Sequence, residues 1–146
     1  MRVERQIVLP TSPAGAWAAL VAWERQPDWM ADADEVRVTS AAREGVGTTV
    51  DVKTRVLTVP SFTERLEVVG WDPPRELRIA HRRFIRGVGT WTLTPAGAGT
   101  RFRWIEDVSL PVPILGRLAL LAYRPFLRHL MGRSMRDLQA SVGSLP

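Results

Sequence analysis

The chain has 146 residues, the size expected of one domain with a substantial hydrophobic core, so we expect a single domain over residues 1–146. It contains no cysteine, which excludes disulfides, thiolate metal sites and cysteine nucleophiles. The net charge is +5, and Lys53 is the one lysine among the basic residues. Such charge can attract nucleic acid or anionic lipid, but arginine stems that cover apolar surface explain it more simply, and we expect no nucleic-acid partner.

Residues 3–9 alternate between apolar and other side chains, which predicts a first strand. Ser12 before Pro13 is typical of an N-cap followed by proline at the first helical position. We therefore expect a helix over residues 13–21 and a second short helical segment over residues 22–30. The first ten residues lack the apolar run of a signal peptide, and we expect a cytoplasmic protein.

The middle of the chain is typical of a meander of six strands. Residues 48–57 alternate most clearly, and glycine and proline separate the predicted strands. The expected strand positions are residues 36–38, 48–57, 62–71, 77–81, 90–94 and 102–108.

The last third of the chain has the pattern of one long helix. Apolar residues recur at three- and four-residue steps from Leu115 to Val142. Pro125 lies within this pattern and should kink or restart the helix, because it lacks an N–H and its ring clashes with the preceding turn. The longest apolar stretch, residues 110–122, is interrupted by Arg117 and is too short to span a bilayer.

Together these patterns predict an α+β fold in which a curved antiparallel sheet of about seven strands wraps around a long, Pro125-kinked C-terminal helix. Strand 3–9 comes first, two short helices follow it, and the other strands form a meander. Such an arrangement commonly leaves a cavity between sheet and helix.

Four segments resemble the START-like, or SRPBCC, helix-grip superfamily, in its polyketide cyclase/dehydrase-like branch. The resemblance covers almost the whole chain and implies the fold, together with a cavity for an apolar ligand. Family members include lipid and sterol carriers, hormone receptors, quinone-binding proteins and polyketide cyclases, so the resemblance alone does not define an activity. The segments are VERQIVLPTSPAGAWAALVAWERQPDWM, VVGWDPPRELRI, GTWTLTPAGAGTRFRW and GRLALLAYRPFLRHLMGRSMRDLQAS.

The content of six tryptophans suits a pocket for a bulky apolar or aromatic ligand, although any one of them can simply fill the core. We expect the ligand-binding residues to come from the inward parity of the strands and from the long helix. They are Trp29, Val52, Thr54, Phe62, Leu66, Ile79, Trp91, Phe102, Trp104, Leu118, Ala122, Tyr123 and Phe126.

Three ionisable residues share the inward parity of their strands and are candidate catalytic groups: Glu64, His81 and Glu106. A carboxyl group in an apolar pocket has a raised pKa and can act as an acid or base, and an imidazole beside it can transfer protons near neutral pH. Aldol-type cyclisation or dehydration of a polyketide requires such transfers. The alternative is structural, in which a bulge shifts the parity and the carboxylates pair with neighbouring arginines.

The sequence therefore supports two main functions: binding of a small hydrophobic or aromatic ligand, lipid- or polyketide-like, and catalysis as a cyclase or dehydratase. No phosphate-binding loop or metal-ligand spacing is present, so we expect no cofactor and no metal. Weak contact with a membrane surface through the arginine-rich helix, or a homodimer through the apolar stretch after Pro111, remains open.

Overall fold

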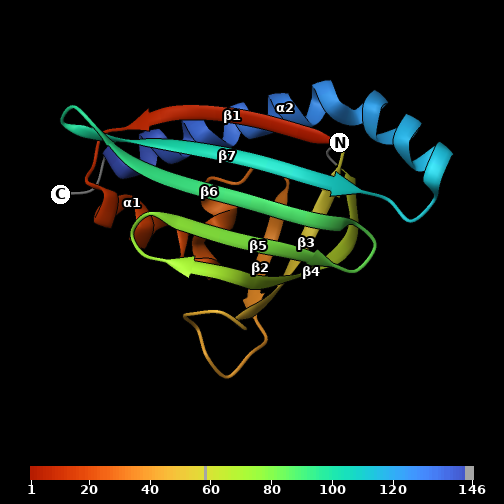
Figure 1. Ribbon diagram of the computed structural model, residues 1–146, viewed down its shortest axis with the longest axis horizontal. Helices are drawn as coiled ribbons and strands as arrows, with labels where there is room; N and C mark the ends of the chain where they lie inside the picture. Colours follow the sequence, from red (N-terminus) through yellow and green to blue (C-terminus); the bar gives the residue numbers. More distant parts are fainter. Residues whose placement is uncertain (58, 144–146) are drawn as a thin grey trace.

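The computed structural model describes residues 1–57 and 59–143 and consists of one antiparallel sheet, two α-helices and a short 3₁₀ helix (Figure 1). The seven strands lie in the order β1-β7-β6-β5-β4-β3-β2, which leaves β1 and β2 at the two edges. This architecture confirms the predicted α+β helix-grip fold. Its elements are β1 (Arg2–Leu9), α1 (Pro13–Leu20), η1 (Trp23–Asp28), β2 (Ala33–Val38), β3 (Thr49–Val56), β4 (Val59–Asp72), β5 (Glu76–Arg82), β6 (Arg86–Ala96), β7 (Gly99–Ser109) and α2 (Pro113–Gly143).

Local sequence signals define the segment between β1 and β2. The hydroxyl of Ser12 accepts a hydrogen bond from the backbone N–H of Gly15 at 3.1 Å, and Pro13 begins α1. The second helical segment is shorter than expected and is the 3₁₀ helix η1, which contains Pro27. The buried amide of Gln26 donates to the carbonyl oxygen of Leu20 at 2.9 Å and so joins η1 to the end of α1.

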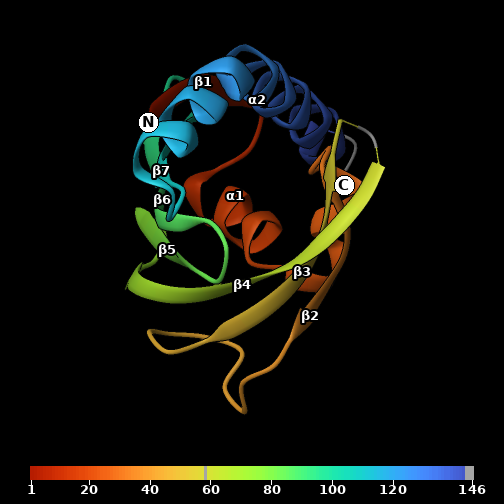
Figure 2. The same ribbon diagram turned by 90° about the vertical axis from the view of Figure 1, so that its right-hand side faces the viewer.

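The sheet curls around α1, and α2 closes its open side (Figure 2). Alternation along the strands directs apolar side chains to the concave face, where they form the core with the C-terminal half of α2. Its largest fully buried side chains include Trp23, Phe102, Leu77, Met135 and Leu138.

Helix α2 also covers β1, one of the two edge strands of the sheet. The side chains of Arg128 and Gln139 donate hydrogen bonds to the carbonyl oxygens of Glu4 and Val8 in β1, at 3.1 and 2.9 Å. These bonds use backbone acceptors that an edge strand would otherwise present to another chain.

Helix α2 continues through Pro125 without a break, so Pro125 does not restart it, but its two halves run in different directions (Figures 1 and 2). Its inward side is one continuous stripe. The stripe runs through Gly116, Leu120, Tyr123, Leu127, Met131, Ser134 and Leu138.

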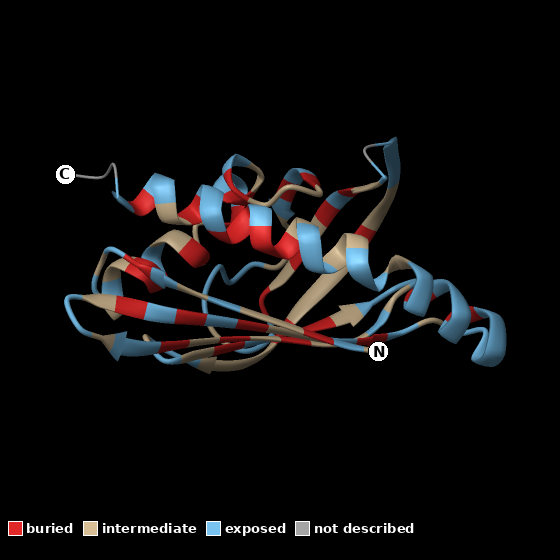
Figure 3. Ribbon diagram, turned by 90° about the horizontal axis from the view of Figure 1, so that it is seen from above, coloured by how far each residue is buried: buried red, intermediate tan, exposed pale blue. Residues whose placement is uncertain are grey.

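The two halves of α2 differ in burial (Figure 3). The C-terminal half packs on the sheet, whereas the N-terminal half has apolar side chains that face away from it. These side chains are Ile114, Leu115, Leu118 and Leu121, exposed by 75%, 69%, 59% and 56%. Within the described residues, no helix is long and apolar enough to cross a membrane.

Candidate functional site

A cavity of about 150 Å³ lies between the concave face of the sheet and α2. Apolar side chains form most of its wall, and a group of ionisable side chains lies on one side of it. Its lining comes from η1 and the segment that follows it, from β3 to β7, the β5–β6 turn and α2. The lining residues are Gln26, Met30, Asp32, Val52, Thr54, Arg55, Val56, Phe62, Glu64, Leu66, Ile79, His81, Ile85, Gly89, Trp91, Trp104, Glu106, Val108, Leu120, Tyr123, Leu127, Leu130, Met131 and Ser134.

Most of the strand residues expected at the ligand site border this cavity: Val52, Thr54, Phe62, Leu66, Ile79, Trp91 and Trp104. Trp29 and Phe102 do not border it, because they lie behind the lining as core. The ring of Trp29 packs 5.9 Å from that of Trp91, and Phe102 stacks at 6.3 Å on Trp104.

Of the four α2 residues expected at the ligand site, Tyr123 borders the cavity and the other three do not. Leu118 and Ala122 are exposed and Phe126 is half-buried, whereas Leu120, which was not expected, borders the cavity. The physical reason is that this half of the helix is apolar on both sides, so hydrophobic spacing did not identify the inward side.

The three candidate catalytic residues come together in the cavity wall. His81 on β5 lies between two carboxylates: its Nδ1 contacts Glu64 Oε1 from β4, and its Nε2 is 3.0 Å from Glu106 Oε2 on β7. All three side chains are nearly buried, exposed by 13% or less. The parity argument placed them on the same face because no bulge lies between them and the rest of their inward residues.

The charge on His81 follows from this geometry. Burial alone would lower its pKa, but hydrogen bonds to Glu106 and Glu64, together with their negative charges, outweigh burial and raise the pKa of His81 to about 10. At neutral pH the ring is therefore an imidazolium with both N–H groups directed at carboxylates. Within the described residues, no group of three or more His, Cys, Asp and Glu side chains is arranged to hold a metal ion.

Two neighbours determine where the carboxylate of Glu106 lies. The indole N–H of Trp104 donates to Glu106 Oε1 at 2.7 Å. Gly89 on β6 lies opposite Glu106 in the register, and a Cβ at this position would come within 2.8 Å of the same oxygen. The lack of a side chain at Gly89 therefore gives the carboxylate room to lie across β6.

A fourth ionisable residue, Asp32, was not expected in the site. It lies between η1 and β2, and tertiary contacts position it: its carbonyl oxygen accepts from the N–H of Arg55 at 2.8 Å. The neighbouring N–H of Ala31 donates to the buried hydroxyl of Ser134 on α2 at 2.9 Å. In the sequence Asp32 is one of several acids in a polar segment, and no local pattern distinguishes it.

Burial raises the pKa of Asp32 to about 6, with further contributions from the negative charges of Glu64 and Glu106, although its own backbone N–H and the charge of His81 oppose the rise. Burial and the charge of Asp32 also raise the pKa of the Tyr123 hydroxyl. The site thus combines a carboxyl that titrates near neutral pH with a fixed ion cluster and a phenol.

The comparisons with known proteins agree with this geometry. The family model described as polyketide cyclase / dehydrase and lipid transport matches residues 1–143. Among curated proteins, no sequence matches the chain.

Solved structures with the same fold have low sequence identity. The protein TTHA0849 from Thermus thermophilus superimposes with a TM-score of 0.79 at 21% identity, over 97% of each chain. The KanY protein has a TM-score of 0.76 at 16% identity, over 99% of this chain and 98% of its own.

The di-domain ARO/CYC StfQ from the steffimycin biosynthetic pathway has a TM-score of 0.75 at 16% identity, and the match covers 95% of this chain and 49% of StfQ. At such identities the structural likeness shows the fold, and the family model shows the relationship. The chain belongs to the polyketide cyclase / dehydrase and lipid transport family.

Proposed function

We propose that the protein binds a small hydrophobic or aromatic molecule, lipid- or polyketide-like, in the cavity between sheet and α2. The observation that carries this proposal is an apolar cavity with a few convergent polar groups, which is the usual composition of a small-molecule site. A structural core would instead be filled, because cavities in cores are costly.

The wall of the cavity suits a planar ring. Trp91 and Trp104 present aromatic surface from neighbouring strands, with centroids 5.9 Å apart, and Met30 and Met131 supply adaptable thioethers. Family membership supports the same chemical class of ligand.

The test is native mass spectrometry of freshly purified protein, paired with extraction of the denatured sample for small molecules. We expect an adduct that is retained at one copy per chain and lost on unfolding. Substitution of the wall by Ile79→Trp should fill the cavity and remove the adduct, whereas Val46→Trp, at an exposed loop position, should retain it. A wild-type protein that takes up no apolar compound in excess would contradict the proposal.

A second function, acid–base catalysis of the cyclase or dehydratase type, is favoured by Asp32 and the Glu64–His81–Glu106 cluster. A carboxylate with a pKa near neutrality can remove a proton from carbon next to a carbonyl and later return it to a departing hydroxyl as water leaves. The Tyr123 hydroxyl, which borders the same cavity, can donate a hydrogen bond to the enolate oxygen that forms between these steps.

This chemistry can be tested without the natural substrate. NMR in heavy water measures the exchange of the carbon-bound protons next to the carbonyl of 2-tetralone, an aromatic ketone that is uncharged at neutral pH. We expect the protein to accelerate exchange, Asp32→Asn to remove most of the acceleration, and Asp28→Asn, an exposed acid at the end of η1, to retain it. No acceleration by the wild type would leave binding as the function.

A further inference from the structure

We infer that the cavity selects ligands which donate hydrogen bonds and carry no negative charge: apolar alcohols, phenols and amines rather than fatty acids or other carboxylates. This inference rests on the proposed binding function and names its substrate class.

The polar atoms of the cavity wall are mainly acceptors. Glu64 and Glu106 present carboxylate oxygens, and both nitrogens of His81 are already directed at them. In the described part of the chain, no side chain donates a hydrogen bond to the carboxylate of Asp32. A ligand that brings N–H or O–H groups can satisfy these oxygens.

The donors that remain for a ligand are few. The amide of Gln26 is used by the carbonyl oxygen of Leu20, and the indole N–H of Trp104 by Glu106. Arg55 forms an ion pair with Asp34. Tyr123 and Ser134 bring hydroxyl groups to the cavity, and neutral hydroxyl donors do not supply the positive charge that a buried anion requires.

The charges around the cavity also disfavour a negatively charged ligand. Two carboxylates against one imidazolium leave a net negative charge, to which ionised Asp32 adds. The charged side chains with the largest effects on the pKa of Asp32 are Glu64, Glu106 and His81, and two of these three are acidic. A carboxylate ligand would therefore meet uncompensated repulsion in a medium that screens weakly.

The experiment compares three probes that share one ring system: 2-naphthalenemethanol, 2-naphthalenemethylamine and 2-naphthoate, by isothermal titration calorimetry at neutral pH. We expect the alcohol and the ammonium to bind and 2-naphthoate to bind at least roughly tenfold more weakly, about 1.4 kcal/mol. Asp32→Asn should narrow this gap, whereas Asp51→Asn, on the outer face of the sheet, should leave it unchanged.

Equal affinity for 2-naphthoate and the alcohol would overturn the inference and leave the proposed binding function intact. Failure of all three probes, together with an absence of co-purified ligand, would remove the binding function and the inference with it. The two failures are thus distinguishable.

A separate observation concerns the surface beside the cavity, and from it we propose that this end of the molecule docks on an anionic lipid bilayer. Three segments lie around this end, which faces the viewer in Figure 2: the end of β3 with the start of β4, the β5–β6 turn and the N-terminal half of α2. Each contributes a lining residue, Val56, Ile85 and Leu120.

The same segments expose large apolar side chains. Phe84 in the β5–β6 turn is 59% exposed and contacts Phe62 of the cavity wall, with ring centroids 6.4 Å apart. Leu57, Val59, Ile114, Leu115, Leu118 and Leu121 are also exposed. Exposed apolar side chains on three segments around one end of the molecule are the kind of feature that marks an interaction surface.

The charge of these segments indicates the partner. Residues 55–59, 82–86 and 110–124 contain six arginines and no aspartate or glutamate. Arg55 and Arg82 pair with Asp34 and Glu67, so the positive charge offered to a partner comes from Arg83, Arg86, Arg117 and Arg124. Apolar side chains flanked by arginine suit an anionic interface, where the apolar groups insert and the guanidinium groups meet lipid phosphates.

The test is co-sedimentation with vesicles of phosphatidylcholine, with and without phosphatidylglycerol. We expect binding only to the anionic vesicles, weakened by salt, and lost in the double variant Phe84→Ser/Leu118→Ser. The control Val8→Ser/Val46→Ser removes two exposed valines elsewhere and should bind like the wild type. Equal binding by both variants would overturn the proposal, as would a wild-type dimer that only Phe84→Ser/Leu118→Ser dissociates, because a second copy would then cover this surface.

Discussion

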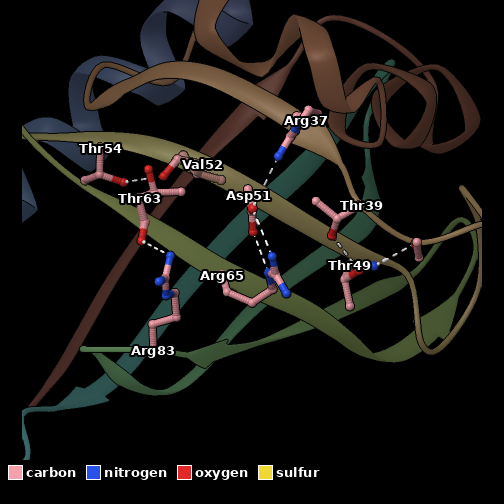
Figure 4. A network of polar contacts seen from close by, with 10 residues as sticks. Arg37, Thr39, Thr49, Asp51, Val52, Thr54, Thr63, Arg65 and Arg83 are labelled. Atoms are coloured by element: carbon pink, nitrogen blue, oxygen red, sulfur yellow. Dashed lines mark hydrogen bonds and ion pairs between the residues drawn. The ribbon is translucent and has the colours of Figure 1, made fainter.

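The β3–β4 hairpin carries polar clusters on both faces, and they differ in character. On the outer face Asp51 accepts from Arg65, with Arg65 Nη2 at 3.0 Å, and Arg37 Nη2 lies 3.8 Å away (Figure 4). On the inner face, one residue along in the register, Val52 lies opposite Glu64, which is paired with His81.

The difference shows what each cluster contributes. The outer arginine side chains are exposed by 44% at Arg65 and 72% at Arg37, so solvent screens the ion pairs and they add little stability. The inner groups have lost their hydration, and replacing such a cluster with apolar residues is often neutral or stabilising. We therefore propose that the inner cluster, which lies beside the cavity, serves recognition or proton transfer. The following experiments test the contrast between the two clusters, from the largest expected effect to the smallest.

Removal of the central cation should have the largest effect. His81→Ala leaves Glu64 and Glu106 buried without their partner, and we expect a loss of about 3–5 kcal/mol in the free energy of unfolding. Urea denaturation at neutral pH measures it. The control is the triple variant Glu64→Gln/His81→Gln/Glu106→Gln, which should be more stable than His81→Ala. A loss of less than about 1 kcal/mol in the free energy of unfolding for His81→Ala would contradict this expectation, because the inner cluster would then contribute as little as the outer ion pairs.

The same cluster should make stability depend on alkaline pH. The pKa of His81 is about 10 in the folded chain and 6.5 ordinarily, so its stabilisation is complete below pH 6.5 and is lost as pH rises through about 10. We expect the urea midpoint of the wild type to fall over this range and that of His81→Ala to fall less. Parallel curves for the two proteins would contradict the assignment.

Asp32 should make stability depend on pH in the acidic range, and its ionised form should destabilise the fold. Its pKa rises from 3.8 to about 6 on folding, so burial of the ionised form costs nothing below pH 3.8 and its full amount above pH 6. The contribution of Asp32 to stability therefore declines between these values, and Asp32→Asn should be more stable than the wild type at neutral pH. Urea denaturation of both proteins at acidic and at neutral pH measures this difference in stability. If Asp32→Asn were less stable than the wild type at neutral pH, the argument from burial would be contradicted.

The outer cluster should give the smallest effect. The hydrogen bond from Arg65 lowers the pKa of Asp51, so the pair stabilises the fold above the ordinary pKa and less as pH falls below it. We expect Asp51→Asn to cost at most about 1 kcal/mol at neutral pH, and less in high salt. If Asp51→Asn lowered the free energy of unfolding as much as His81→Ala, the proposed difference between the outer and inner clusters would be contradicted.

The sequence could predict the part of the site that lies on strands, but not the part that lies outside them. In a strand the side-chain period is fixed by the backbone, so parity alone placed Glu64, His81 and Glu106 on one face. Asp32 could not be found in this way, because its position depends on contacts with Ser134 and Arg55 that are distant in sequence.

The inward side of α2 could not be found for a different reason. Hydrophobic spacing assumes that apolar residues face the core, yet Leu118 is exposed while Gly116 is buried. A helix that is apolar on both sides lacks this signal, and the same excess of exposed apolar residues underlies the proposed docking surface.

The most direct test of ligand binding in this cavity uses the methionine methyl groups, because the chain has four methionines in different places. Met30 and Met131 border the cavity, Met135 is buried in the core, and Met1 borders a separate hollow beside the start of α2. In methyl NMR with ¹³C-labelled methionine, we expect 2-naphthalenemethanol to shift the resonances of Met30 and Met131 and to leave that of Met1 unchanged. A shift confined to Met1, or no shift at saturating ligand, would contradict the account.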